Sequence, residues 1–278
     1  MSITREVCSA AIELYHRALP PAVSRAAGRS LLNVLGAAVG GSRTPAVQVA
    51  IEAGLRIGGT GVVPVPGRRE RLAPHQAAIA IGMAAHVDDF DDTHLATVIH
   101  PAAAVLSAGL AVAAGVAPSG GEFLRAFAIG CEVQLRVGLA MTPSHYDAGW
   151  HITGTCGVVG AAVTAALLLD ADVDRLDAAI GLAATRTLGV REGFGTMAKS
   201  FHPGKAGAVG RRSALLALAG QDSPHGVLDP GGGYFEVLAP ETDRAVVVAG
   251  AGTDWHLLDN TFKPYPCGIV CHPAIDAA

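Results

Sequence analysis

The sequence is poor in charge, in aromatic side chains and in basic character, and each shortage excludes a class of protein. Charged residues make up 16% of the 278 residues and hydrophobic residues 50%, the opposite of the composition that keeps a chain disordered. A formal net charge of −4 and 5% aromatic residues provide neither the basic surface nor the stacking platforms that nucleic-acid binding requires. We therefore expect a globular protein without a nucleic-acid partner.

Long apolar runs and paired cysteines are also missing. The most apolar stretch, residues 102–117, is shorter than the roughly 20 residues that span a bilayer. Arg5 and Glu6 interrupt the first apolar residues, unlike the apolar core of a signal peptide. The five cysteines are scattered and odd in number, in a chain large enough to fold without disulfides. These features predict a cytoplasmic protein with no membrane partner.

The sequence is rich in helical periodicity. Apolar residues recur at three- and four-residue intervals in segments that end at prolines or glycines. The expected helices are residues 3–18, 22–39, 45–55, 73–86, 102–114, 120–139, 157–169, 174–188 and 205–218. Asp174 is a candidate N-cap, and a short strand or extended loop is expected within residues 58–66. No alternating run is long enough for a larger sheet, so the predicted fold class is mainly α.

The densest polar cluster runs from His86 to His94 and is followed by His100. If this segment is helical, His86, Asp89 and Thr93 share one face and present an imidazole, a carboxylate and a hydroxyl to one small substrate. The alternative is a solvated acidic turn. The glycine and the final glutamate of a calcium-binding loop are absent. The apolar helices on both sides favour a functional role.

A second cluster is Gly149-Trp150-His151, shortly before the apolar helix expected from residue 157. A helix start offers free N–H groups and the positive end of the helix dipole, which suit a carboxylate ligand. A structural core histidine beside Trp150 fits these residues equally well.

A third cluster, residues 193–205, contains Lys199, His202 and Lys205 ahead of an expected helix. Cations at such a position predict an anion site, and solvated surface lysines are the alternative. The segment also has the spacing G-x-G-x-x-A, but it lacks the strand and βαβ context of a dinucleotide-binding fold. We therefore predict no nucleotide cofactor.

A fourth cluster, residues 263–272, places Lys263 and Tyr265 next to two prolines, which restrict the backbone and hold both side chains rigidly. A structural proline-rich turn is the alternative. A zinc site at Cys267, Cys271 and His272 is disfavoured, because the chain has no second ligand pair at zinc-finger spacing and two of these residues are adjacent. We predict no metal ion.

These clusters carry a resemblance to a known family. The segment 85–93 with His100-Pro101, the triplet 149–151, the segment 194–202, and residues 263–267 with His272 resemble the motifs of the MmgE/PrpD family in order and spacing. That family includes 2-methylcitrate dehydratase, cis-aconitate decarboxylase and iminodisuccinate epimerase. The resemblance implies a large all-helical domain at residues 1–258, the start of a small α+β lid domain at 259–278, a homodimer, small di- or tricarboxylate substrates and no cofactor.

The resemblance also implies roles for particular residues. The expected catalytic residues are Asp89, His100, His151 and Lys199. With the clusters above, the expected substrate-binding residues are Thr93, His202, Lys205, Lys263 and Tyr265. The family's T-K-P-x-H motif keeps its lysine and histidine here, but its threonine and proline are replaced by Ala198 and Ser200.

Two departures from the family matter for function. The decarboxylases carry an active-site histidine near the position of Gly268, which argues against decarboxylation of cis-aconitate. The sequence stops at Ala278, where relatives continue into the lid, so we expect most of the lid to be lacking. An open pocket admits water and weakens its electrostatics.

The leading hypothesis is a lyase that dehydrates a 2-methylcitrate-like hydroxy-polycarboxylate, a step known from propionate catabolism. His151 or His100 would be the base in its neutral form, Asp89 would orient a histidine, and Lys199 and Lys263 would bind carboxylates and stabilise enolate-like charge. The alternatives are an epimerase, isomerase or decarboxylase acting on related acids, and a non-catalytic helical subunit that requires a lid-bearing partner.

Overall fold

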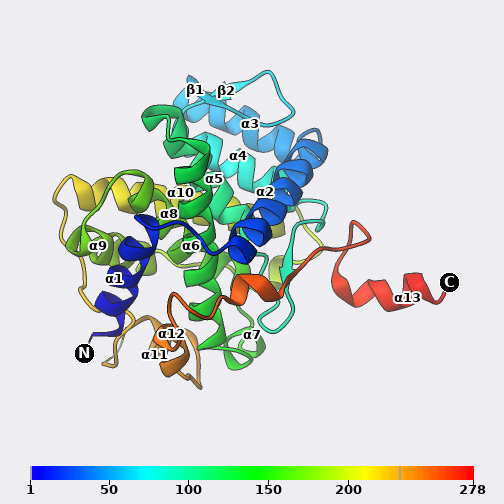
Figure 1. The fold of residues 1–278 in the computed structure, drawn as a ribbon. Helices are drawn as coiled ribbons and strands as arrows, with labels where there is room; N and C mark the ends of the chain where they lie inside the picture. Colours follow the sequence, from blue (N-terminus) through cyan, green and yellow to red (C-terminus); the bar gives the residue numbers. More distant parts are fainter. Residues whose placement is uncertain (1, 232) are drawn as a thin grey trace.

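The computed structural model describes residues 2–231 and 233–278, and it confirms the mainly α prediction (Figure 1). The α-helices in this part of the chain are α1 (Ile3–Tyr15), α2 (Pro21–Gly41), α3 (Pro45–Gly58), α4 (Pro74–His86), α5 (Ala102–Val116), α6 (Gly120–Leu139), α7 (Ser144–Asp147), α8 (Ile152–Leu168), α9 (Val173–Ala184), α10 (Ala198–Leu218), α11 (Tyr234–Leu238), α12 (Ala245–Val248) and α13 (His272–Asp276).

Short 3-10 turns and two small antiparallel strand pairs complete the fold. The 3-10 turns are η1 (Arg191–Gly193), η2 (His256–Asp259) and η3 (Ile269–Cys271). Strand β1 (Thr60–Pro64) pairs with β2 (Arg71–Leu72), and β3 (Thr93–His94) pairs with β4 (Asn260–Thr261). The first pair contains the short strand expected within residues 58–66.

Helix α8 forms the centre of the molecule. Every one of its residues is buried, and it packs against α5, α6, α9 and α10. Its sequence contains no charged residue, so burying the whole helix buries no charged side chain of its own. Among the described helices, none combines the length and the apolar character needed to cross a bilayer.

Glycines allow the central helices to approach one another closely. A Cβ atom added to Gly82 of α4 would lie 2.5 Å from the Cα of Gly204 of α10. A Cβ atom added to Gly160 of α8 would lie 2.6 Å from the carbonyl oxygen of Gly130 of α6. Real Cβ atoms do not approach other atoms this closely, so these helix crossings require residues without side chains.

Two helices that carry site residues begin earlier than the sequence predicted. Helix α8 starts at Ile152 instead of residue 157, and His151 is its N-cap residue. Helix α10 starts at Ala198 instead of residue 205 and contains Pro203 in its second turn. Pro203 is the sixth residue of α10 and has no N–H, so the Lys199 carbonyl loses the i→i−4 hydrogen bond that another residue would donate. The sequence therefore predicted both His151 and Lys199 in loops. In the structure, His151 caps α8 and Lys199 lies within α10.

Helix α9 also differs from its prediction. Its N-cap is Asp172, whose side chain accepts a hydrogen bond of 2.8 Å from the backbone N–H of Arg175. Asp174 instead lies in the first turn, where its charge suits the positive end of the helix dipole. The helix ends at Ala184, four residues before the expected end, because the chain turns there toward η1.

The acidic cluster is not helical, so the prediction of one helical face was wrong. Helix α4 ends at His86, and the backbone then turns through Asp89, which has a φ of 51°. Aspartate tolerates this left-handed conformation better than most residues do. Thr93 lies in β3 opposite Thr261 of β4. The segment therefore forms a turn followed by the strand β3, which pairs with β4.

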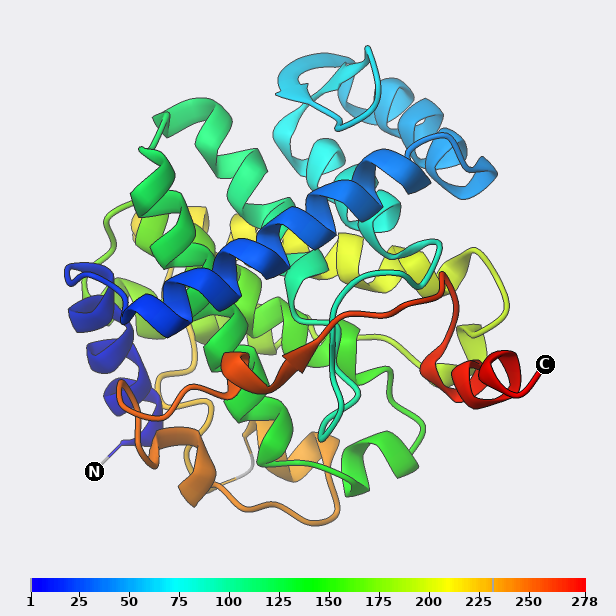
Figure 2. The same ribbon diagram turned by 45° about the vertical axis from the view of Figure 1, so that its right-hand side comes forward.

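The last described residues lie along one side of the helical body. Figure 2 shows the chain running from η2 through β4 beside the segment that contains β3, and ending in α13 at the edge of the molecule. The residues of α13 are exposed or only partly buried. The division into domains at residue 258 stays a prediction.

The close crossing of α6 and α8 gives a stability test. We expect Gly160→Ala to lower the free energy of unfolding by about 1–3 kcal/mol, because the added methyl group meets backbone that must shift. Gly36 lies inside α2 with nothing within 4 Å of an added Cβ, so Gly36→Ala should raise it by about 0.5–1 kcal/mol. Urea denaturation measures both values, and equal effects of the two substitutions would contradict this description of the crossing.

Candidate active site

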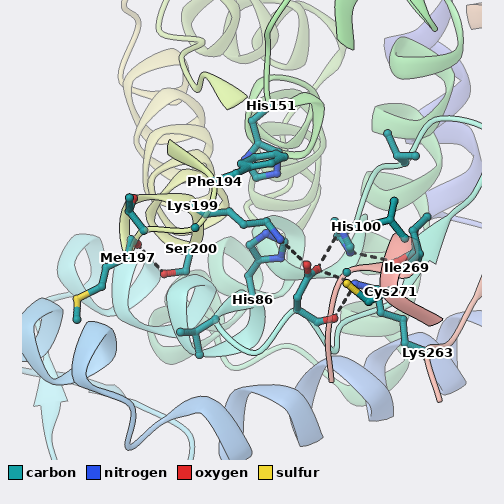
Figure 3. A pocket seen from close by; sticks show the side chains of 18 of the residues that line it. His86, His100, His151, Phe194, Met197, Lys199, Ser200, Lys263, Ile269 and Cys271 are labelled. Carbon is teal, nitrogen blue, oxygen red and sulfur yellow. Dashed lines mark hydrogen bonds and ion pairs between the residues drawn. The ribbon is translucent and has the colours of Figure 1, made fainter. Parts of the chain in front are cut away.

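A cavity of about 750 Å³ lies where the end of α4, the β3 segment, the starts of α8 and α10, and residues 263–271 meet. Polar side chains from all four sequence clusters line it: His86, Asp89, Thr93, His100, His151, Lys199 and Lys263. Figure 3 shows the labelled lysine and histidine side chains directed toward a common centre. Most other lining residues are apolar or small, such as Phe194 and Gly268.

Asp89 lies between two ammonium groups. Its Oδ2 accepts a hydrogen bond from Lys199 Nζ at 2.6 Å, and its Oδ1 accepts one from Lys263 Nζ at 2.6 Å. Lys263 Nζ also donates to the backbone oxygen of Asp89 at 2.6 Å. Burial by itself raises the pKa of this carboxyl, but His100, His86 and the two lysines outweigh it and hold the pKa well below its usual range.

The two lysines reach Asp89 from different elements. Lys199 is in the first turn of α10. Lys263 follows β4 and is 7% exposed. The position of Lys263 depends on the β3–β4 pairing, which is reinforced by a hydrogen bond of 2.6 Å from Thr261 Oγ1 to the carbonyl oxygen of Thr93.

His100 is held as a neutral base. Its Nδ1 lies 3.0 Å from the carbonyl oxygen of Asp92 and 3.1 Å from Thr93 Oγ1. Because a carbonyl oxygen only accepts, Nδ1 carries the hydrogen and Nε2 keeps its lone pair. Burial lowers the pKa of His100 to about 4, so the ring is neutral near pH 7. Its Nε2 lies 3.6 Å from Asp89 Oδ1.

His151 pairs with the imidazole of His202. Its Nδ1 lies 2.8 Å from Nδ1 of His202, so one ring donates and the other accepts. Burial, with the charges of nearby histidines and Lys199, lowers the pKa of His151 well below its usual value. The Phe194 ring packs edge-on against His151, with ring centroids 4.9 Å apart, and Lys199 Nζ lies 5.4 Å from the Phe194 centroid.

A buried histidine–carboxylate pair lies beneath these groups. His86 Nδ1 and Asp91 Oδ2 are 2.8 Å apart, and neither side chain is exposed. His86 Nε2 has no hydrogen-bond partner among the described residues. The sequence placed both residues in the acidic cluster; it gave His86 a possible substrate contact on a helical face and assigned Asp91 no role. Their five-residue separation is not a helical spacing, so only the turn after α4 shows that they meet.

Three of the expected substrate-binding residues, Lys205, Tyr265 and His202, lie outside the cavity lining. Lys205 Nζ donates to the carbonyl oxygen of Arg186 at 3.0 Å. Tyr265 donates from its hydroxyl to Asp276 Oδ1 at 2.8 Å, near the end of the described chain. His202 reaches the cavity only through its contact with His151.

The cavity also contains a set of side chains with the atom types of a metal site. One nitrogen or oxygen from each of His86, Asp89, Asp91 and His100 lies within 4.8 Å of the others. Lys199 and Lys263 already supply two positive charges to Asp89 at 2.6 Å, and these charges would repel a cation. The arrangement therefore suits an anionic ligand better than a metal ion.

Comparison with known proteins agrees with this geometry. The family model of the MmgE/PrpD N-terminal domain matches residues 5–246. The chain belongs to the MmgE/PrpD family. It is similar to cis-aconitate decarboxylase of Aspergillus terreus (strain NIH 2624 / FGSC A1156), with 28% identity over 289 residues that cover 99% of this chain and 59% of the relative. It is 30% identical to human cis-aconitate decarboxylase over 286 residues, which cover all of this chain and 59% of the relative.

Membership of the MmgE/PrpD family confirms the resemblance seen in the four sequence clusters. The chain spans about three fifths of the length of these curated relatives. Within it, the four MmgE/PrpD-like clusters lie far apart in sequence, and each contributes at least one side chain to the same cavity.

The ion pairs of Asp89 give a second test. Asp89→Asn should lower the free energy of unfolding at pH 7 by about 3 kcal/mol, because it leaves Lys263 buried without an anionic partner. The neighbouring Asp88 is exposed, so Asp88→Asn should change it by less than about 0.5 kcal/mol. Chemical denaturation of both variants measures this difference.

The same pair predicts a pH dependence. The folded-state pKa of Asp89 is lowered, so its stabilising contribution is complete above the unfolded value of about 3.9 and declines as the pH falls below it. The stability gap between the wild type and Asp89→Asn should stay constant from pH 7 to about pH 5 and narrow below about pH 4. A gap that widens toward low pH would contradict the assigned ion pairs.

Proposed function

We propose that this protein is a lyase that acts on a small polycarboxylate by proton abstraction, with dehydration of a 2-methylcitrate-like hydroxy acid as the leading reaction. The observation that carries the proposal is His100. Its Nδ1 is committed to the Asp92 carbonyl oxygen, and its pKa of about 4 keeps Nε2 unprotonated near pH 7. A general base must present such a lone pair at the working pH.

Charge in the cavity supports an anionic substrate. Lys199 and Lys263 together carry two positive charges against the single negative charge of Asp89. A substrate carboxylate can share these ammonium protons or replace part of the Asp89 contact. Lys199 Nζ lies 5.4 Å from the centroid of the Phe194 ring, a cation–π contact that favours the charged ammonium group.

The dehydration uses these groups in a balanced sequence. His100 Nε2 removes a proton from the carbon beside a substrate carboxylate, and the C–H electron pair forms the enolate that the lysines stabilise. The double bond then forms as the C–O bond breaks. The hydroxyl takes a proton from Lys199, the more exposed of the two lysines, and leaves as water. The imidazolium of His100 is stabilised by the Asp89 carboxylate 3.6 Å away.

Decarboxylation of a cis-aconitate-like acid is the second candidate, and similarity to cis-aconitate decarboxylases supports it. In that reaction a C–C bond breaks, CO₂ leaves, and the remaining carbanion takes a proton. Gly268 argues for dehydration instead. It lines the cavity, and a Cβ added there would lie 3.5 Å from Asp89 Oδ2, yet the residue contributes no imidazole where the resemblance expects a decarboxylase histidine. The homodimer and the cytoplasmic location remain predictions.

A substrate panel tests the proposal. We expect purified protein to increase near-ultraviolet absorbance with 2-methylcitrate, because the product contains a conjugated double bond, and to release no CO₂. Release of CO₂ from cis-aconitate would replace dehydration with the second candidate. Exchange of substrate hydrogen for deuterium without either product would indicate an epimerase. Folded protein with none of these activities would contradict a catalytic role for this chain.

Variants test the assigned base. We expect His100→Gln to lower kcat by about 10²–10⁴-fold, while His225→Gln, at a side chain that is 67% exposed and pairs with Asp177, should leave kcat unchanged. His151→Ala should also lower turnover by orders of magnitude if His151 takes part in proton transfer.

The pH profile provides a separate check on the same base. With a pKa of about 4 for His100, kcat/KM of the wild type should keep its base-dependent activity down to about pH 5 and lose it as Nε2 becomes protonated. An acidic limb centred near 6.5, the ordinary histidine value, or full activity of His100→Gln, would exclude His100 as the base.

A further inference from the structure

A second cluster of ligand-type side chains lies beside the candidate active site, outside the cavity lining. It consists of His94, His256 and Asp259, each of which offers one atom, and these atoms lie within 4.8 Å of one another. Successive residues of a strand point to opposite faces. Thr93 of β3 contacts His100 in the cavity, and the next residue, His94, faces η2.

The local backbone brings the three side chains together. His256 and Asp259 are the first and fourth residues of η2, and side chains three residues apart eclipse one another in a 3-10 turn. Pairing of β3 with β4, which follows η2 directly, sets His94 against this turn. The rings of His94 and His256 have centroids 6.4 Å apart and planes at 78°.

Thr97 occupies one ring nitrogen of His94. His94 Nδ1 lies 2.9 Å from Thr97 Oγ1, and that hydroxyl also lies 3.4 Å from the His94 carbonyl oxygen. In the tautomer whose Nδ1–H donates to this hydroxyl, Nε2 keeps its lone pair for a ligand. Metal-binding histidines characteristically donate their other ring N–H to such an outer partner.

The turn that carries the other two side chains is already anchored. The backbone N–H groups of His256 and Leu257 donate to the carboxylate of Glu132 on α6 at 3.2 and 3.0 Å. Glu132 is buried and also accepts from Arg136 at 2.7 Å. The start of η2 is thus fixed against the helical body, which reduces the ordering cost of binding a ligand there.

We propose that His94, His256 and Asp259 form a binding site for a divalent transition-metal ion of the zinc type. Two imidazole nitrogens and one carboxylate oxygen are a ligand set that zinc accepts, with water in the fourth position. Magnesium and calcium prefer all-oxygen sites. Asp259 supplies a negative charge that favours a cation at this position.

The position of this site gives it a structural consequence. An ion there joins residues 94–97 to η2, and η2 leads through β4 to Lys263, which contacts Asp89. Binding would therefore stabilise the strand pair that positions one of the two active-site lysines. This inference concerns binding and does not depend on the proposed lyase reaction.

Titration of the metal-free protein with zinc, followed by calorimetry without substrate, tests the site. We expect one zinc ion per chain and a higher melting temperature with zinc. His256→Ala and Asp259→Asn should each weaken binding at least about tenfold, and Thr97→Val should weaken it about 10–100-fold through the lost outer hydrogen bond. His16→Ala removes another surface histidine and should leave zinc affinity unchanged.

Cobalt(II) distinguishes this site from Cys267, Cys271 and His272, another group of metal-ligand residue types. The His256→Ala variant distinguishes it from the histidine–carboxylate set of the active-site cavity. The proposed site should give a cobalt spectrum without a thiolate charge-transfer band, and Cys271→Ser should bind zinc normally. A thiolate band, loss of binding in Cys271→Ser, equal affinities of the wild type and His256→Ala, or the absence of one-to-one zinc binding would each overturn the proposal.

Discussion

The carboxylate of Asp89 accepts hydrogen bonds from Lys199 on α10 and from Lys263 beyond β4, and it thereby joins three distant stretches of chain at one point. Each partner alone would be costly. An unpaired Lys263, almost fully buried, would lose hydration without compensation, and an unpaired Asp89 in its turn would repel an anionic substrate. Together these three groups carry one net positive charge, beside a cavity lined largely by apolar and small residues, and the buried Asp91 carboxylate lies near them.

The two lysines also influence the protonation of the neighbouring imidazoles. Burial is the main reason that His100 and His151 have lowered pKa values, and a lysine contributes in the same direction to each. The lysines that would bind a substrate carboxylate thus also help to keep the bases unprotonated. Under the proposed function, the same electrostatic arrangement would serve both carboxylate binding and proton abstraction, and perturbed titratable groups of this kind are typical of active sites.

The small residues of the core make this convergence possible. Close crossings at Gly82 with Gly204, and at Gly130 with Gly160, bring α4, α6, α8 and α10 together with little space between them. The end of α4 and the starts of α8 and α10 consequently meet at one cavity, each bringing a histidine or a lysine. Bulkier side chains at these crossings would separate the helices and, with them, the polar groups that line the cavity.

The sequence by itself determined the mainly α class, the short strand near residue 62, and the four motifs whose residues line the cavity, because helical periodicity and residue type are local properties. Only the tertiary structure decided which motif residues meet. His86 pairs with Asp91 because the chain turns after α4, whereas a helix would have placed His86 with Asp89 and Thr93 on one face. Lys205 and Tyr265 have suitable chemistry but contact Arg186 and Asp276 instead. These contacts depend on where the chain turns and on how its segments pack, which no local pattern contains.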